Sequence, residues 1–177
     1  MNSYLSIAFS DLVLIPATAQ LAQAELRSQS DLCALLRVLP PPSWPPPLTA
    51  DTLELFAAEL SSEPSKFPWS KWYLLHSPPG GSATPVGIVG FKTPPVLRRV
   101  EIGYSVIPER QCCGFASRAV TVLLQWCDGT GLVDVVEAQT LPDLLPSLRV
   151  LEKTGFSFAR QGQEDGQITV VWERCRR

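Results

Sequence analysis

The chain has 177 residues, of which 45% are hydrophobic and 18% charged, and its formal net charge is -2. This size fits one domain with a substantial core, and the composition excludes disorder as the main state, which needs low hydrophobicity and high net charge. The lack of a basic excess disfavours binding to nucleic acid through phosphate contacts. The 17 prolines are about double the average usage.

The five cysteines form no Cys-x-x-Cys pair, and the only histidine is His76. A metal site is therefore not expected, and the odd cysteine count is typical of reduced thiols in a cytoplasmic protein. Met1 to Leu14 has no basic residue ahead of its apolar residues and is interrupted by Asp11, so a signal peptide is not expected. No apolar run approaches the roughly 18 residues of a membrane span, and a membrane partner is not expected.

The first part of the chain predicts a strand followed by helices. Leu12 to Pro16 is a short apolar run that ends at a proline, as in a strand. Ala17 to Arg27 is rich in helix formers, and residues 31–38 either continue this helix or form a second one. Pro40 to Pro47 is expected to be an extended loop, because proline is excluded from helix interiors and central strands. Residues 51–60 have the apolar spacing of a helix.

From Lys71 onward the pattern becomes that of strands. A three-strand meander is expected over residues 72–75, 86–91 and 100–107, since Pro- and Gly-rich turns separate these apolar runs. A helix with one buried face follows over residues 114–126.

The last part predicts a strand over residues 133–138, a short helix over 147–153, and strands over 156–159 and 167–172 around a hairpin turn that contains Asp165. This order of elements is typical of an α/β sandwich with a mostly antiparallel sheet in a single domain. The strand–helix–strand unit should form a right-handed parallel crossover.

The segment from Gln111 to Ser117 joins a strand to the start of a helix. A helix N-terminus leaves backbone N–H groups unpaired beside the positive end of its dipole. Gly114 would let the backbone approach a bulky anion, and Ala116 keeps the first turn uncrowded. Such a turn can bind a pyrophosphate, although many glycine-containing turns of this kind bind nothing.

The same segment reads Gln111-Cys112-Cys113-Gly114-Phe115-Ala116. It matches all three defined positions of the phosphate loop Arg/Gln-x-x-Gly-x-Gly/Ala of the GNAT superfamily of acetyl-CoA-dependent N-acetyltransferases, which the chain therefore resembles. Residues 138–143 and 147–156 are similar to the Rim-type branch, which acetylates the N-termini of ribosomal proteins. The resemblance covers residues 70 to 175 well and the first 65 only by the order of their elements.

The resemblance implies an α/β (α+β) fold, with a mixed, mostly antiparallel sheet of six or seven strands split into a V and flanked by about four helices. It implies acetyl-CoA as the cosubstrate and a primary amine as the acceptor, either a protein N-terminus or a small molecule. Residues 1–70 would form the acceptor side of the single domain 1–177, and residues 71–177 the acetyl-CoA-binding core. Both a monomer and a homodimer are compatible with the resemblance.

The cofactor-binding positions implied by the resemblance form two groups. The first group would hold the pyrophosphate at the helix start, and it consists of Gln111, Cys112, Cys113, Gly114, Phe115, Ala116 and Ser117. The second group would pair its backbone with the pantetheine arm like an added strand, and it consists of Ser105, Val106 and Ile107. The two adjacent cysteines occupy variable positions of the motif and are interpreted as loop residues rather than nucleophiles.

Two residues are candidates for catalysis. Glu101 stands where family members with a glutamate base carry it, and a partly desolvated carboxylate there could take the proton of the acceptor ammonium. The alternative is a surface glutamate paired with Arg98 or Arg99, because strand alternation does not say which side of the strand faces the cleft. Ser147 matches the Rim-type serine that would bond the thiol sulfur, or it only caps its helix.

Two leucines depart from the family pattern. Leu144 stands where an asparagine often bonds the pantetheine arm, and Leu151 stands where other branches carry a tyrosine as general acid. Ser147 or water is then left to protonate the thiolate, and Tyr104 is expected to pack rather than to act. These departures favour an alternative function, a catalytically degenerate acyl-CoA-binding or regulatory module.

The acceptor site is expected between the N-terminal helices and the central strands. The stiff loop from Pro40 to Pro47 is predicted to form a rigid wall of this site. Its candidate aromatic lining residues, for each of which core packing is the alternative, are Trp44, Phe56, Trp69 and Trp72.

Overall fold

The computed structural model of the protein describes residues 5–47, 49–164 and 166–176; Asp165 of the predicted hairpin turn and residues 1–4 of the N-terminal segment lie outside these ranges. The strands are β1 (Ile7–Phe9), β2 (Leu12–Pro16), β3 (Lys71–His76), β4 (Thr84–Phe91), β5 (Arg99–Val106), β6 (Val135–Thr140), β7 (Ser157–Glu164) and β8 (Gln167–Cys175). The α-helices are α1 (Ala19–Arg27), α2 (Gln29–Leu36), α3 (Leu53–Ser62), α4 (Phe115–Thr130) and α5 (Leu145–Lys153).

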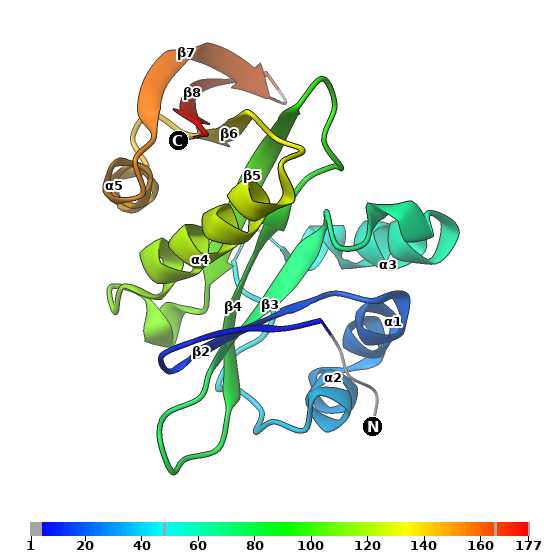
Figure 1. The fold of residues 1–177 in the computed structure, drawn as a ribbon. Coiled ribbons are helices and arrows are strands. Elements are labelled where there is room, and N and C mark those ends of the chain that lie inside the picture. The colour runs from blue at the N-terminus through cyan, green and yellow to red at the C-terminus, as the bar shows by residue number, and fades with distance from the viewer. Residues whose placement is uncertain (1–4, 48, 165, 177) are drawn as a thin grey trace.

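The described strands form one sheet in the order β1-β2-β3-β4-β5-β6-β8-β7 (Figure 1). Strands β5 and β6 pair in parallel, and the other neighbours pair antiparallel. Helix α4 connects the parallel pair, as predicted for the crossover. In the part of the chain that the structure describes, no helix is both long and apolar enough to cross a membrane.

The predicted mixed, mostly antiparallel sheet is confirmed, but the described residues form eight strands rather than six or seven, and five α-helices rather than about four. The added strand β1 has three residues, too few to show a period, and it pairs with β2 across a turn at Ser10, whose φ is 57°. Helices α1 and α2 are separate because Ser28 ends the first in extended backbone, while its Oγ accepts a bond from Asp31 N in the second.

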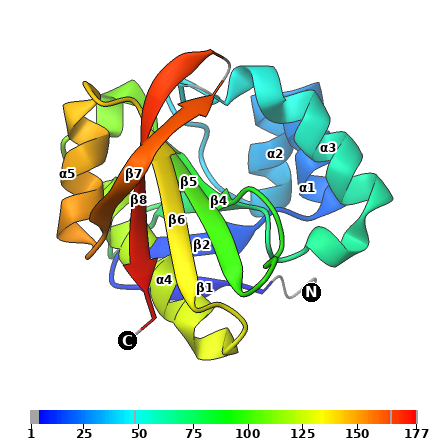
Figure 2. The same ribbon diagram turned by 90° about the horizontal axis from the view of Figure 1, so that it is seen from above.

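The two faces of the sheet are covered by different helices. Figure 1 shows α4 lying across one face, and Figure 2 shows α1, α2 and α3 gathered on the side away from α5. Along β3, Trp72 and Leu74 belong to the core under α4, whereas Tyr73 and Leu75 belong to the core under α1 to α3. This alternation follows from the two-residue period of a strand, and it fixes which face each residue of the neighbouring strands occupies.

Two of the four aromatic residues that were candidates for the acceptor site belong to the core under α4. Trp69 packs against Phe91 and Trp126, with ring centroids 5.1 and 4.8 Å away. Trp72 is fully buried, and its Nε1 donates to Pro68 O at 2.8 Å. Core packing, the alternative interpretation, therefore holds for both tryptophans.

The sheet opens between β5 and β6. These strands pair only where Arg99 to Glu101 lie beside Val135 to Glu137. Strand β5 continues to Val106 and β6 to Thr140 without further pairing between them. The two strands therefore separate at their carboxyl ends, where the predicted V opens.

A buried charged cluster joins α1, β3 and the proline-rich loop. The carboxylate of Glu25 accepts bonds from Lys71 Nζ (2.5 Å), Tyr73 OH (2.8 Å) and Trp44 Nε1 (3.0 Å). Glu25 and Lys71 are both nearly inaccessible to solvent. Burial raises the pKa of Tyr73 well above its usual value, and the charge of Glu25 adds to this. The cluster fixes Trp44, and with it the proline-rich loop, on the face of the sheet that α1 to α3 cover.

Tyr73→Phe is expected to lower the free energy of unfolding by about 2 kcal/mol, because hydrogen bonds to charged groups contribute roughly 1.5 to 3 kcal/mol. The substitution keeps the ring and removes one donor from the buried carboxylate of Glu25. Urea unfolding of the variant and the wild type measures the difference. Gln29→Ala is a matched comparison, since it removes a neutral bond to Pro41 O and should cost about 1 kcal/mol. An unfolding free energy of Tyr73→Phe equal to that of the wild type would contradict a stabilising role for the cluster.

Candidate active site

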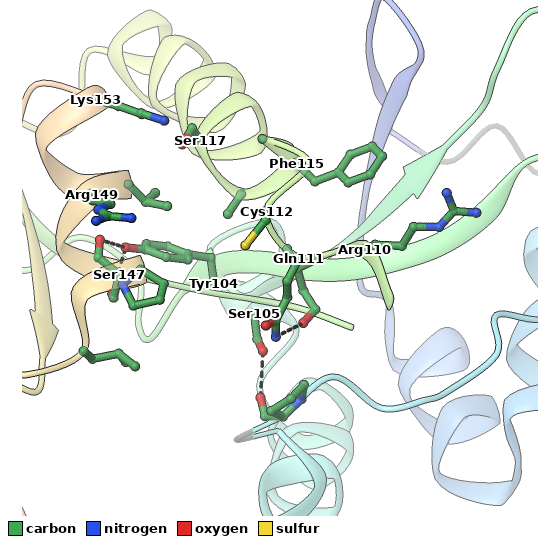
Figure 3. Close-up of a pocket in the computed structure, with 17 residues that line it drawn as sticks. Tyr104, Ser105, Arg110, Gln111, Cys112, Phe115, Ser117, Ser147, Arg149 and Lys153 are labelled. Carbon is green, nitrogen blue, oxygen red and sulfur yellow. Dashed lines mark hydrogen bonds between the residues drawn. The ribbon is translucent and has the colours of Figure 1, made fainter. Parts of the chain in front are cut away.

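A cavity of about 490 Å³ lies where β5 and β6 separate, bounded by the end of β5, the start of α4 and one side of α5 (Figure 3). Among its lining residues are Tyr104 to Val106 from β5, Gly114 to Ser117 from the start of α4, and Ser147 from α5. Three segments that are distant in the sequence thus meet at the opening of the sheet.

The hydrogen-bond register of β5 decides which of its backbone groups face the opening. Lys92 N donates to Glu101 O (2.9 Å) and Ile107 N donates to Val86 O (3.0 Å). Because alternate residues of an antiparallel pair are hydrogen-bonded to each other, odd-numbered residues of β5 direct their backbone toward β4. Tyr104 and Val106 direct theirs toward β6, which no longer pairs with β5 there.

This register corrects one prediction. Ile107 is fully buried and its N–H is used by β4, and the backbone of Ser105 also faces β4. Neither can pair with a pantetheine arm like an added strand. The backbone groups that face the opening are those of Tyr104 and Val106, and Val106 O also accepts a bond from the side chain of Gln111.

The predicted phosphate loop ends at the first turn of α4. Gly114 is the residue before the helix, with φ of 78°, and a Cβ added to it would meet no atom within 4 Å. No side chain caps the helix at this end among the described residues. The first N–H groups of α4, starting at Phe115, are therefore available to an anion.

Within this loop, Gln111 is bonded to β5, whereas Cys113 lies away from the cavity. Gln111 Nε2 donates to Val106 O (3.1 Å), so this side chain fastens the loop to the end of β5. Cys113 is exposed and is not among the residues that line the cavity, unlike Cys112.

The charged side chains that line the cavity are all basic. They are Arg110, Arg149 and Lys153, and no aspartate or glutamate lines the cavity among the described residues. Arg149 and Lys153 are four residues apart on α5 and so lie on the same side of that helix. Together with the positive end of α4, these groups make the cavity suitable for a ligand that carries several negative charges.

A pair of hydroxyl groups lies at the α5 side of the cavity. Tyr104 OH is 3.0 Å from Ser147 Oγ and 3.1 Å from Ser147 O (Figure 3). Burial raises the pKa of Tyr104, and the bond with Ser147 opposes this effect only in part. Tyr104 thus contacts a predicted functional residue, which the expectation of a packing role did not include.

Glu101 lies on the opposite face of β5 from Tyr104. Its neighbour Ile102 is in the core under α4, so strand alternation directs Glu101 toward the side of α1 to α3. Lys92 Nζ is 2.7 Å from Glu101 Oε1 and 2.9 Å from Glu164 Oε1. Apart from this ion pair, Oε1 of Glu101 is buried without a hydrogen-bond partner among the described residues.

The expected alternative partners of Glu101 are engaged elsewhere. Arg98 bonds both carboxylate oxygens of Asp134, and Arg99 bonds Glu137 and Glu173. Glu101 is not among the cavity-lining residues. It lies in the stretch where β5 still pairs with β6, directly before the strands separate.

The proline-rich loop reaches the same region. Ser105 Oγ donates to Pro47 O (2.7 Å), and Pro47 lines the cavity. Ser43 Oγ donates to Glu109 Oε2 (2.8 Å), which ties the loop to the turn after β5. Of the predicted site residues, the structure brings together at the cavity Ser105, Val106, Gln111, Cys112, Gly114, Phe115, Ala116, Ser117 and Ser147.

A family model described as an acetyltransferase (GNAT) domain matches residues 11–157. No curated protein matches the sequence.

Among the solved structures that the fold resembles is the ribosomal-protein-S5-alanine acetyltransferase from Vibrio fischeri, with a TM-score of 0.67, 17% identity and coverage of 97% of each chain. RimL, the ribosomal L7/L12 alpha-N-protein acetyltransferase in complex with coenzyme A, has a TM-score of 0.68 and 15% identity, over 97% of this chain and 98% of that one. The microcin C7 self immunity acetyltransferase MccE, in complex with acetyl-CoA and AMP, has a TM-score of 0.66 and 12% identity, over 94% and 93%. At these identities the likeness is one of fold.

Proposed function

Because the chain belongs to the GNAT acetyltransferase family, we propose that it transfers the acetyl group of acetyl-CoA to a primary amine, by direct attack of the amine on the thioester. The observation that carries this proposal is the cavity itself, where an uncapped helix N-terminus and the open edge of β5 meet. A pyrophosphate suits the first, and an amide-containing arm suits the second.

The charges and shape of the cavity support acetyl-CoA as the cosubstrate. The N–H groups at the start of α4 would bind the pyrophosphate, and the backbone of Tyr104 and Val106 would pair with the amides of the pantetheine arm. The basic side chains of Arg149 and Lys153, on the α5 side, would pair with phosphate oxygens of the cosubstrate that the N–H groups of α4 leave free. This arrangement would leave the thioester end near Ser147.

We assign the removal of the ammonium proton to one residue and the stabilisation of the thiolate to another. Glu101 would take the proton of the acceptor ammonium, directly or through a water molecule, since it stands at the edge of the opening on the side away from the thiol. Lys92 stays charged beside it: burial lowers the pKa of Lys92, but the carboxylates of Glu101 and Glu164 outweigh this and raise it. Ser147 would donate a hydrogen bond to the sulfur as the thiolate leaves.

The acceptor would approach from the side of α1 to α3, which carries Glu101. In this proposal residues 1–70 form the acceptor side of one catalytic domain, and a protein N-terminus or a small amine is acetylated. The ribosomal-protein acetyltransferases among the similar folds support a protein N-terminus as the first acceptor to test.

The test is release of free CoA in the presence of acetyl-CoA and a panel of N-terminal peptides and small amines, combined with the thermal shift that acetyl-CoA causes. We expect turnover with at least one acceptor and an increased melting temperature in the presence of acetyl-CoA. Leu151, which is fully buried in the core, has no ionisable proton, so this position supplies no general acid. Its identity favours the degenerate acyl-CoA-binding module as the second candidate. That module would show the thermal shift without turnover, and the absence of both effects would contradict the proposed function.

Replacing the six prolines between Pro40 and Pro47 by glycine and serine is expected to raise the KM of the acceptor about tenfold. Each proline that fits its native backbone stabilises the ordered loop by roughly 0.4 to 1 kcal/mol, because it restricts the flexible form of the chain. A tenfold change in KM corresponds to about 1.4 kcal/mol, which is within the combined effect of several prolines. Steady-state kinetics with Ser43 and Trp44 retained measure this effect. An unchanged acceptor KM would remove the loop from the acceptor site.

A further inference from the structure

Besides the basic side chains of Arg149 and Lys153, which the proposed function assigns to phosphate, Ser147 is the polar side chain that the α5 side of the cavity offers among the described residues. Next to Ser147 the lining residues include Leu144, Pro146 and Val150, and Leu151 is buried in the core. Tyr104 is the residue whose hydroxyl contacts Ser147, at 3.0 Å from Oγ. It comes from β5, 43 residues earlier in the chain, so the contact exists only because the fold brings α5 against the opening of the sheet.

We propose that Tyr104 is a positioning residue for acetyl transfer, which acts through Ser147 and orients the serine hydroxyl toward the sulfur of CoA. This inference rests on the proposed function. Either hydroxyl of the pair can act as the donor, and the hydrogen of Tyr104 has Ser147 O, at 3.1 Å, as its other acceptor. When Tyr104 O–H donates to Ser147 Oγ, the serine hydrogen is free to point into the cavity.

The bonds of the reaction balance without a proton from Tyr104. The new N–C bond of the amide forms, the C–S bond of the thioester breaks, and its electron pair stays on the sulfur. Glu101 takes the ammonium proton before attack, and the proton that nitrogen loses after attack neutralises the thiolate through solvent. Two hydroxyl groups in series strengthen each other as donors, so the pair stabilises charge that develops on sulfur in the transition state.

The surroundings of Tyr104 keep it in the donor form. Its ring packs against the core under α4, and burial raises the pKa of its hydroxyl. The phenol therefore stays protonated at neutral and mildly alkaline pH. A tyrosine that only packed there would affect stability and leave the rate of acetyl transfer unchanged.

The test compares Tyr104→Phe, Ser147→Ala and the double variant in single-turnover acetyl transfer to a peptide amine, with enzyme in excess over acetyl-CoA. Tyr104→Phe is expected to lower the rate constant about tenfold, which corresponds to about 1.4 kcal/mol and lies at the upper end for one net hydrogen bond. The Kd of acetyl-CoA should stay within about twofold. The double variant should be no slower than Ser147→Ala alone, because both hydroxyls act at one point.

Tyr73→Phe is the matched control, since it removes the same group from β3, where the hydroxyl bonds Glu25. It should lower stability and leave the single-turnover rate at saturating acceptor unchanged. A wild-type rate constant in Tyr104→Phe would overturn the role of Tyr104 but not the proposed function. The same holds if the rate reductions of the two single variants multiply in the double variant. A wild type that binds acetyl-CoA but transfers nothing to any amine would overturn the proposed function, and this inference with it.

Discussion

Gly114→Glu is expected to lower the affinity for acetyl-CoA at least about a hundredfold, because a like charge placed against the pyrophosphate costs several kcal/mol, and each factor of ten is about 1.4 kcal/mol. The position has room for a side chain, since a Cβ there meets no atom within 4 Å. The new carboxylate would itself occupy the N–H groups at the start of α4, where an anion stabilises the helix. Isothermal titration with acetyl-CoA measures the loss.

Gly131→Glu provides the control at the other end of the same helix. Gly131 is the residue after α4, and its φ of 70° is close to the 78° of Gly114. Both substitutions place an L side chain in the left-handed region, which costs roughly 1 to 2 kcal/mol. Only Gly114→Glu should lose acetyl-CoA binding, whereas equal affinities of the two variants would refute the assignment of the phosphate loop.

Glu101→Gln is expected to slow acetyl transfer by roughly 10² to 10⁴, the range for removal of a general base, with little change in the Kd of acetyl-CoA. The amide keeps the shape of the side chain but cannot take the ammonium proton. Single-turnover rates with a peptide acceptor separate this loss from product release.

Glu137→Gln is the matched control for Glu101. The two glutamates lie side by side in register on β5 and β6, but Glu137 is bound by Arg99 and Arg160. Its replacement should leave the rate within about threefold, the scale of a modest electrostatic perturbation. If Glu101→Gln were as active as Glu137→Gln, a water chain or another group would have to act as the base.

Local signals in the sequence predicted most of the elements and the turn at Gly114 that begins α4. A glycine that must adopt a positive φ before a helix is a local requirement, so Gly114 could be identified from its neighbours. The face on which Glu101 lies could not, because alternation gives only its parity relative to Ile102. That choice depends on which side of the sheet α4 covers, and this is decided by packing.

Contacts between distant segments were outside the reach of the sequence. The contact of Tyr104 with Ser147 joins residues 43 positions apart, and the bond of Tyr73 to Glu25 spans 48. Both involve side chains whose local patterns are typical of packing. Strand β1 was missed for a different reason, since its three residues are too few for a periodic signal.

A crystal structure of the protein with bound acetyl-CoA would test acetyl transfer at this cavity. We expect the pyrophosphate at the N–H groups that follow Gly114, the pantetheine arm along the backbone of Tyr104 and Val106, and the thioester sulfur within hydrogen-bond distance of Ser147 Oγ. Acetyl-CoA bound outside this cavity, or bound in it with the thioester directed away from Tyr104 and Ser147, would contradict acetyl transfer at this site.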